Sequence, residues 1–239
     1  MSTFPTHAAP NFDRLARAYR WMEWASFGPF LGICRSTFLS RLTRCRDALV
    51  LGDGDGRFTA RLLRATPHLR VHAVDASPAM LAALIHACGS NAARLTTECA
   101  DLRTWQPRPA PTRPYDLVDT HFFLDCFSAS EVLALAQGVR PIVSPDAVWV
   151  VSEFDVPTGW FGRFVAGPVV LSLYLAFGLL TGLKQRALPD YASSLSASGF
   201  RRIERRVRLG GLLVSELWTP TSASSAHTLR QSLRDLTGR

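Results

Sequence analysis

An apolar run at residues 48–51 is followed at once by three glycines at alternate positions, Gly52, Gly54 and Gly56. A short, wholly apolar run is typical of a strand that is buried on both faces of a parallel sheet. Glycines directly after such a strand allow a turn in which the backbone passes close to a ligand. The next segment, 57–65, has its apolar residues at helical spacing. The sequence therefore predicts a strand, a ligand-binding turn and a helix in direct succession.

The same alternation of strand and helix continues along the chain. Ser77 before Pro78 is a favoured helix start, and Ser128 with Glu131 has the pattern of a capping box. Further strands are predicted at 71–75, 94–101, 115–123 and 147–154, and helices at 79–88 and 128–139. Elements alternating at this spacing predict an α/β fold with a doubly wound, mostly parallel sheet.

The flanking segments have a different pattern. Residues 11–46 have helical spacing, and two strand-like runs joined by Gly210 and Gly211 indicate an antiparallel hairpin after a helix at 191–200. We therefore predict one domain over residues 1–218, made of a helical cap (11–46), a ligand-binding core (47–156), an apolar helical insertion (157–190) and a final helix and hairpin (191–218), with a polar tail at 219–239.

The chain is basic, with a net charge of +8, but Lys184 is its only lysine. Clustered arginines offer a face for RNA or anionic lipid. A solvated, arginine-rich surface is the simpler interpretation, and we expect no nucleic-acid partner. The five cysteines are scattered without zinc-ligand spacing, so we expect reduced thiols and no metal site. The N-terminus has no signal-peptide pattern, so a cytoplasmic location is expected.

Residues 164–183 form a run of 20 residues without a charge. By length alone such a run could span a bilayer. It contains Gly167 and Pro168, however, and the α/β pattern lies on both sides of it. We predict a buried or pocket-lining helix that does not span a membrane. The alternative is a helix that lies in a membrane interface as a peripheral contact.

The glycine turn does not match two common phosphate-binding motifs. A P-loop needs Gly-Lys at its end, and here Gly56 is followed by Arg57; a dinucleotide fingerprint needs G-x-G-x-x-G, and here the spacing is G-x-G-x-G. Asp53 and Asp55 would also repel a pyrophosphate at the following helix start. An acidic turn suits a cationic ligand without phosphate, and S-adenosylmethionine, with its sulfonium and ammonium groups, has this character.

With these motifs the chain resembles the class I S-adenosylmethionine-dependent methyltransferases, over residues 45–156 by motif and 11–218 by layout. The layout is similar to the ubiquinone/menaquinone-type branch of that family. The resemblance implies a Rossmann-like, seven-stranded α/β fold with an N-terminal helical cap and a C-terminal antiparallel hairpin. It also implies S-adenosyl-L-methionine as the cofactor and a small molecule as the methyl acceptor.

The resemblance assigns the cofactor site residue by residue. The glycine turn approaches the cofactor, Asp75 at the end of the second strand holds the ribose hydroxyls, and Asp101 after the third strand pairs with the adenine amine. The residues implied to bind the cofactor are Gly52, Asp53, Gly54, Gly56, Asp75, Ala76, Met80, Asp101 and Leu102. One position departs from the family, because Val50 stands where an acidic residue is usual. We expect Asp53 to take over the contact to the methionine end.

The acceptor site of the family opens after the fourth strand, where this chain has His121 and Asp125. A histidine there is suited to accept the proton of a hydroxyl acceptor. The alternatives are a ring stacked under the adenine or packed in the core. Asp125 either orients His121 or caps the next helix. Glu153 ends the fifth strand, as a substrate-side group or as the partner of an arginine.

Tyr19, Trp21 and Tyr174 either form an aromatic lid over the acceptor or belong to the core. The predicted walls are apolar and aromatic, which suits a phenol, a quinol or a lipid-like carboxylate. We therefore expect S-adenosylmethionine-dependent methyl transfer to a small, largely hydrophobic acceptor at oxygen. The alternatives are an RNA methyltransferase that uses the arginine-rich faces, and a non-catalytic cofactor-binding or membrane-associated protein. The sequence makes no prediction for the oligomeric state.

Overall fold

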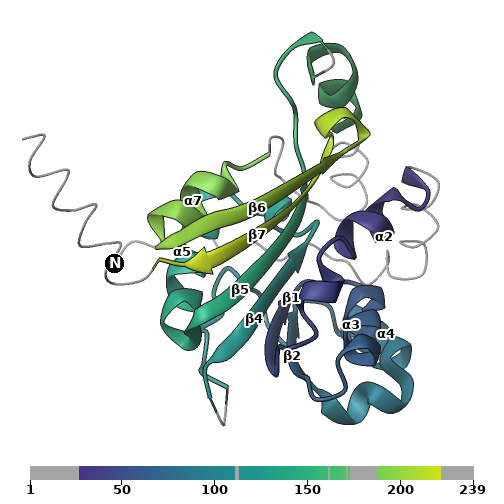
Figure 1. Ribbon diagram of the computed structural model, residues 1–239, viewed down its shortest axis with the longest axis vertical. Helices are drawn as coiled ribbons and strands as arrows, with labels where there is room; N and C mark the ends of the chain where they lie inside the picture. The colour runs from purple at the N-terminus through teal and green to yellow at the C-terminus, as the bar shows by residue number, and fades with distance from the viewer. Residues whose placement is uncertain (1–26, 111–112, 161, 171, 173–187, 222–239) are drawn as a thin grey trace, which may run out of the picture.

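The computed structural model describes residues 27–110, 113–160, 162–170, 172 and 188–221 of the chain (Figure 1). The predicted helix before residue 27, the polar tail after residue 221 and most of the apolar run at 164–183 lie outside these residues.

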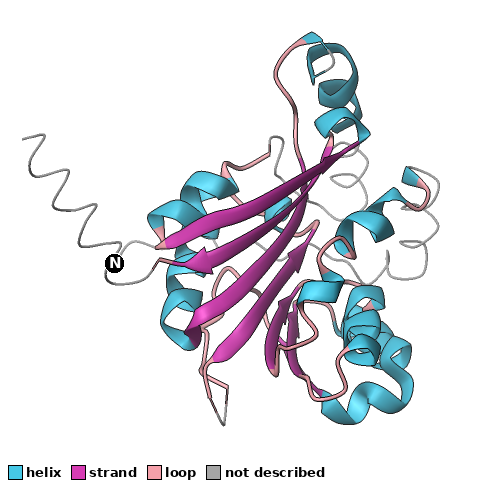
Figure 2. Ribbon diagram, viewed as in Figure 1, coloured by secondary structure: helices cyan, strands magenta, loops and turns pink. Residues whose placement is uncertain are grey.

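A seven-stranded sheet forms the centre of the molecule (Figure 2). Its strands are β1 (Asp47–Leu51), β2 (Arg70–Asp75), β3 (Leu95–Cys99), β4 (Tyr115–His121), β5 (Val143–Phe154), β6 (Phe200–Arg208) and β7 (Leu213–Pro220). They lie in the order β3-β2-β1-β4-β5-β7-β6. The pairs among β1 to β5 are parallel, and β7 is antiparallel to both β5 and β6. The predicted mostly parallel sheet with a C-terminal antiparallel hairpin is confirmed.

Two hydrophobic cores lie on the two faces of this sheet. The helices are α2 (Phe30–Arg35), α3 (Arg57–Ala65), α4 (Pro78–Cys88), α5 (Ala129–Val139) and α7 (Tyr191–Ala197). Strand β1 contributes to both cores, because Leu49 packs on the α5 and α7 side while Val50 packs on the α3 and α4 side. Alternation of side chains along a buried strand produces this division. Val50 is therefore an ordinary core residue of a sheet that is covered on both faces.

The strands of the sheet lie where the sequence patterns place them, but several bounds differ, and β5 begins at Val143 instead of residue 147. The capping box of Ser128 and Glu131 is present at the start of α5. The described part of the predicted helical cap (11–46) contains only the short α2 and a 3-10 turn, Leu39–Arg41. The predicted strand at 115–123 ends at His121, because Phe122 has a left-handed φ of 52°. A reversal of this kind stops the strand ladder and changes the direction of the next side chains.

The chain leaves β5 and forms a short π-helix, Gly162–Ala166, that continues as an α-helix. Ala166 and Val170 pack against Leu212, just before β7. Within the described part of the chain, no helix has the length and apolarity needed to cross a bilayer.

Candidate functional site

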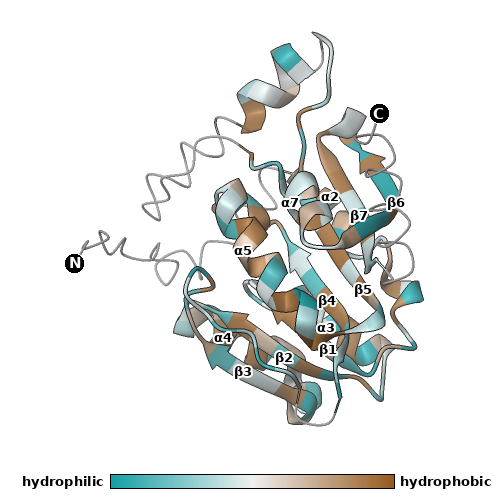
Figure 3. Cartoon of the chain, turned by 90° about the vertical axis from the view of Figure 1, so that its left-hand side faces the viewer, coloured by the Kyte–Doolittle hydropathy of each residue, from teal (hydrophilic) through white to brown (hydrophobic). Residues whose placement is uncertain are grey.

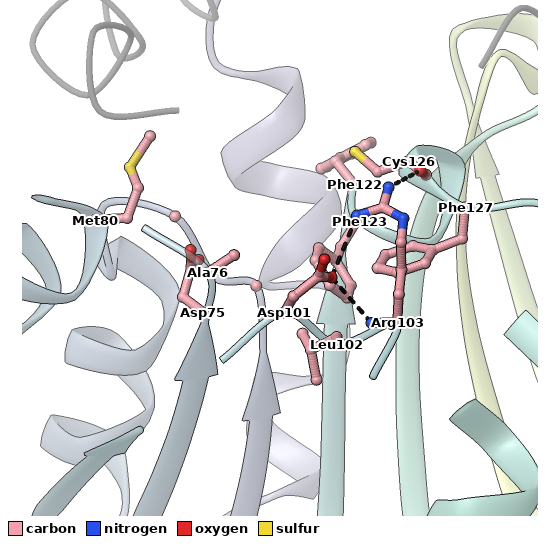
Figure 4. A pocket seen from close by; sticks show the side chains of 12 residues that line it. Asp75, Ala76, Met80, Asp101, Leu102, Arg103, Phe122, Phe123, Cys126 and Phe127 are labelled. Carbon is pink, nitrogen blue, oxygen red and sulfur yellow. Dashed lines mark hydrogen bonds and ion pairs between the residues drawn. The ribbon is translucent and has the colours of Figure 1, made fainter. Parts of the chain in front are cut away.

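A pocket with about 640 Å³ of empty space, including the part open to solvent, lies at the carboxyl ends of β1, β2 and β4 (Figure 4). Ligands of open parallel sheets bind at this edge. Seven of the residues expected to bind the cofactor line it: Gly52, Gly54, Asp75, Ala76, Met80, Asp101 and Leu102. Five further lining residues were not predicted from the sequence: Arg103, Phe122, Phe123, Cys126 and Phe127.

The three glycines of the turn have positive φ angles and two separate functions. Gly52, with φ at 67°, lies directly under the ring of Phe123, and a Cβ at this position would be only 2.1 Å from the ring. Gly56, with φ at 74°, packs against the backbone of Leu84, which a Cβ would approach to 2.5 Å. Gly56 therefore brings α3 and α4 together, whereas Gly52 allows the loop after β4 to cover the turn.

Asp75 ends β2 and faces the pocket together with Ala76 and Met80 (Figure 4). Its Oδ1 accepts a hydrogen bond of 2.8 Å from the backbone N–H of Ser77. Ser77 in turn caps α4 by accepting from the N–H of Met80 at 3.1 Å. These two bonds fix the turn between β2 and α4, so the carboxylate of Asp75 is held at the edge of the pocket.

Arg103 connects the two loops that form the other side of the pocket. Its guanidinium lies 3.3 Å from Asp101 and 3.2 Å from Glu131, and it donates to the carbonyl oxygen of Cys126 at 3.1 Å. The same group lies 4.8 Å from the ring centre of Phe127. Arg103 therefore neutralises two carboxylates and fixes the loop after β3 to the loop after β4 (Figure 4).

The two aspartates of the glycine turn are not among the residues that line the pocket. Asp53 is buried, and its Oδ2 accepts bonds from the N–H of Thr59 at 2.9 Å and from its hydroxyl at 2.7 Å. Asp55 pairs with Arg57 at 2.8 Å. The sequence argument that these charges face a cationic ligand is therefore corrected, and Asp53 does not take over a cofactor contact here. Both carboxylates instead fix the turn to the start of α3.

His121 lies in the core and does not line the pocket. Its side chain is 0% exposed, with Nε2 2.9 Å from Oδ1 of Asp119 and the ring edge-on to Phe58 at 4.3 Å. His121 is the last residue of β4, and its side chain follows the alternation of the strand and faces α3. The backbone reverses at Phe122, so the side chain of Phe122 lines the pocket instead. The expected position of His121 beside the reacting methyl group is thus not found, and the core alternative describes its environment.

Asp53 and Asp119 form a buried acidic pair beside His121. Burial, and then the negative charge of Asp119, raise the pKa of Asp53 to about 6. Because this folded-state pKa is above the ordinary 3.8, the folded state binds the proton more tightly than the unfolded chain does. The resulting stability is complete below pH 3.8 and is lost as the pH rises through about 6.

An Asp53→Asn variant should therefore be more stable than the wild type at neutral pH. The asparagine keeps an oxygen that accepts from Thr59, but it carries no charge that must be buried. We therefore expect its free energy of unfolding to exceed that of the wild type by about 2–3 kcal/mol at pH 8, and this difference should shrink toward pH 4. Urea unfolding of both proteins across this range measures the difference. A gain that does not change with pH would show that ionisation of Asp53 is not its cause.

Glu153 and the half-buried Asp125 are next to residues that line the pocket. Oε1 of the buried Glu153 accepts bonds from the N–H groups of Phe123 at 2.9 Å and Leu124 at 2.7 Å, so the end of β5 holds the loop after β4. Burial, and then the charge of Asp125, raise the pKa of Glu153 well above its usual range. Burial likewise raises the pKa of Asp125 to about 6, and the thiol of the lining residue Cys126 lies 3.6 Å from Oδ1 of Asp125.

Three predicted substrate residues, Tyr19, Trp21 and Tyr174, lie outside the described residues. In the part of the chain that is described, no three His, Cys, Asp or Glu side chains are grouped closely enough to hold a metal ion.

Residues 48–146 match the model of a family described as a methyltransferase domain. A search among curated proteins gave no match. Solved structures with a similar fold include a mitomycin 7-O-methyltransferase (18% identity over 88% of this chain and 61% of that chain, TM-score 0.62). Another is the N,N-8-amino-8-demethyl-D-riboflavin dimethyltransferase of Streptomyces davawensis (20% identity, 90% and 63% covered, TM-score 0.61). A third is human N-acetylserotonin methyltransferase in complex with S-adenosylmethionine (16% identity, 88% and 56% covered, TM-score 0.61). The chain thus spans less than two thirds of the length of these three proteins.

Proposed function

We propose that this chain, whose residues 48–146 form a class I S-adenosylmethionine-dependent methyltransferase domain, transfers a methyl group to an oxygen atom of a small, largely hydrophobic acceptor. The observation that carries the proposal is the composition of the pocket. The pocket brings the glycine turn and the carboxylates of Asp75 and Asp101 together with the rings of Phe122 and Phe123.

The residues present fit the cofactor. Glycine backbone and Asp75 offer acceptors for a ribose and a cationic methionine end, while Asp101 and Leu102 offer a carboxylate and an apolar surface for an adenine. Among the described residues that line the pocket, Arg103 is the one cation, and it is already paired with Asp101 and Glu131, so these residues offer no free positive charge for a phosphate. S-adenosylmethionine, when bound, supplies a methyl group on a positively charged sulfur. The protein then mainly aligns donor and acceptor.

The acceptor side is aromatic. The ring of Phe122 packs on Phe154 with 5.0 Å between centres, and Phe154 packs on Phe27 at 5.3 Å. These rings come from the loop after β4, the end of β5 and the segment before α2, and those of Phe154 and Phe27 pack in line behind Phe122, which itself forms part of the pocket wall. Such a wall favours a flat or aliphatic acceptor with few charges. The oxygen specificity remains our proposal, since the named structures include both an O-methyltransferase and an enzyme acting on an amino group.

We propose Asp125, rather than His121, as the group that receives the proton of the acceptor hydroxyl. S-adenosylmethionine held at Asp75 and Asp101 would supply the methyl group to the acceptor oxygen and would keep the electron pair of the broken carbon–sulfur bond on sulfur, and the Asp125 carboxylate would take the hydroxyl proton. Asp125 adjoins the lining residue Cys126, and burial raises its pKa to about 6, which suits a base at neutral pH. His121 is closed off from the pocket and pairs with Asp119.

An Asp125→Asn variant should therefore lower turnover by about 10²–10⁴-fold and leave cofactor affinity nearly unchanged. Turnover of the wild type should fall as the pH drops below about 6, when the Asp125 carboxylate is protonated.

A His121→Asn variant should lose stability and keep most of its turnover per folded molecule. Single-turnover rates and cofactor titrations of both variants decide between the residues, and a large rate loss in His121→Asn alone would reinstate the histidine.

The test of the proposed reaction uses S-adenosylmethionine with a labelled methyl group. Phenols, quinols and long-chain carboxylic acids are offered beside amines of matching shape and beside RNA, and the products are identified by mass spectrometry. We expect label on the oxygen acceptors and none on the amines. Label on the amines alone would refute oxygen specificity, and label on RNA alone would support the RNA alternative.

The arginine-rich strand β6 gives that RNA alternative little support. Arg202 lies 2.7 Å from Glu216, Arg206 lies 2.8 Å from Glu204, and Arg205 pairs with Asp155. Each of these three guanidinium groups already has a carboxylate partner. Glu204 and Glu216 belong to the same hairpin, and Asp155 directly follows the neighbouring strand β5. A surface of paired charges attracts the phosphates of RNA less than its arginine count implies.

A further inference from the structure

The helical segment after β5, described at residues 160 and 162–170, has apolar side chains on two sides. On one side Ala166 and Val170 are buried against Leu212. On the other side Phe164 is 68% exposed, and Trp160, just before the helix, is 73% exposed. These are the two most exposed large apolar side chains among the described residues. Scattered apolar residues on a surface are ordinary, but two large aromatic rings four residues apart form a shared patch.

The segment is attached firmly to the sheet on its buried side. The N–H of Asp155 donates to the carbonyl oxygen of Leu212 at 2.9 Å, which holds the start of the segment to the turn between β6 and β7. In Figures 1 and 3 the segment stands at the end of the molecule beside that turn. It follows Phe154 at the carboxyl end of β5, and the pocket lies at the carboxyl ends of the neighbouring strands. The exposed rings are therefore presented outward at the same edge of the sheet as the pocket.

The charged residues between Asp155, which pairs with Arg205, and Asp190 are all positive. Residues 156–189 contain Arg163, Lys184 and Arg186 but no aspartate or glutamate. The guanidinium of Arg163 lies 5.6 Å from the ring centre of Phe164, so a cation is next to the exposed aromatic surface. Aromatic rings combined with basic residues are typical of segments that lie at the boundary between headgroups and acyl chains. The positive charge complements an anionic lipid surface.

We propose that Trp160 and Phe164, with Arg163 between them, dock the protein on the surface of an anionic lipid bilayer. The rings enter the interface, and the guanidinium remains at the level of the headgroup phosphates. A second copy of the chain is the other occupant to consider, but it would place Arg163 against the Arg163 of its neighbour in a symmetric contact. The docking surface stands independently of the proposed reaction. If that reaction is also correct, docking brings the pocket edge to where hydrophobic acceptors dissolve.

Flotation with lipid vesicles tests this proposal. The wild-type protein is mixed with vesicles of phosphatidylcholine alone or of phosphatidylcholine with phosphatidylglycerol. We expect flotation with the anionic vesicles, weaker binding to the neutral ones, and a decrease with added salt. A double variant, Trp160→Ser with Phe164→Ser, should reduce binding by about tenfold or more, because its apolar contact is removed. Arg163→Glu should also weaken binding to the anionic vesicles specifically.

The control is a double variant with Ile203→Ser and Val207→Ser on β6, whose side chains are 45% and 58% exposed. It removes a similar kind of exposed apolar surface away from the proposed patch, and its flotation should equal that of the wild type. Equal S-adenosylmethionine binding by all variants verifies that they are folded. No flotation of the wild type, equal flotation of both double variants, or sedimentation as a dimer that only the Trp160/Phe164 variant abolishes would each overturn the proposal.

Discussion

Replacing Asp75 by alanine should weaken S-adenosylmethionine binding by about 1.5–3 kcal/mol, which is roughly ten- to 150-fold in Kd. Asp75 lies at the end of β2, and the bond from Ser77 holds its carboxylate at the pocket edge. A ribose hydroxyl that donates to this carboxylate makes a charge-assisted hydrogen bond, and alanine removes it. Isothermal titration calorimetry of wild type and variant measures the loss directly.

Asp190→Ala is the matched control for this variant. Asp190 also accepts a backbone N–H, from Ser193 at 2.9 Å, at the start of α7. Replacing Asp190 by alanine removes a comparable local hydrogen bond and should lower the free energy of unfolding by about 1 kcal/mol. Asp190 does not line the pocket. We expect its cofactor affinity to equal that of the wild type. Equal affinities for the wild type and Asp75→Ala would remove Asp75 from the binding site.

Replacing Gly52 by alanine should abolish measurable cofactor binding, with a loss of about 100-fold or more expected from the steric conflict. The new Cβ would be 2.1 Å from the ring of Phe123, and the ring or the turn has to move into the space of the pocket that both line. The positive φ of 67° adds a backbone penalty of about 1–2 kcal/mol. Calorimetry measures the loss of cofactor affinity, and thermal unfolding measures the loss of stability.

Gly89→Ala separates the backbone penalty from the steric conflict. Gly89, at the end of α4, has φ at 54°, and a Cβ there would meet nothing within 4 Å. This variant should lose stability through its backbone conformation alone and bind the cofactor as the wild type does. If both alanine variants kept full affinity, the contact between Gly52 and Phe123 would have no part in shaping the site.

The fold, and the edge of the sheet at which seven of the expected site residues line one pocket, were predictable from the sequence because their signals are local. Apolar runs and helical spacing mark the elements, and the carboxyl ends of parallel strands meet at one edge. Gly52, Asp75 and Asp101 follow three successive strands of the chain, so they had to come together there once the sheet was parallel.

The direction of individual side chains was not predictable in the same way. His121 and Phe122 are neighbours, yet one is in the core and the other lines the pocket, because the backbone reverses at Phe122 with φ at 52°. Asp53 turns inward because Thr59, in the first turn of α3, offers it two donors. Arg103 was missed because its partners, Glu131 and Phe127, come from distant parts of the chain. The direction of each of these side chains depends on tertiary contacts rather than on the local sequence pattern.

The central claim is that the pocket at the carboxyl edge of β1, β2 and β4 binds the methyl donor and opens onto the aromatic wall. A crystal structure of the protein with S-adenosylhomocysteine, the demethylated donor, tests it most directly. We predict the ribose at Asp75, the adenine beside Asp101 and Leu102, and the sulfur directed toward Phe122. A cofactor bound elsewhere, or with its sulfur directed away from Phe122, would contradict the account.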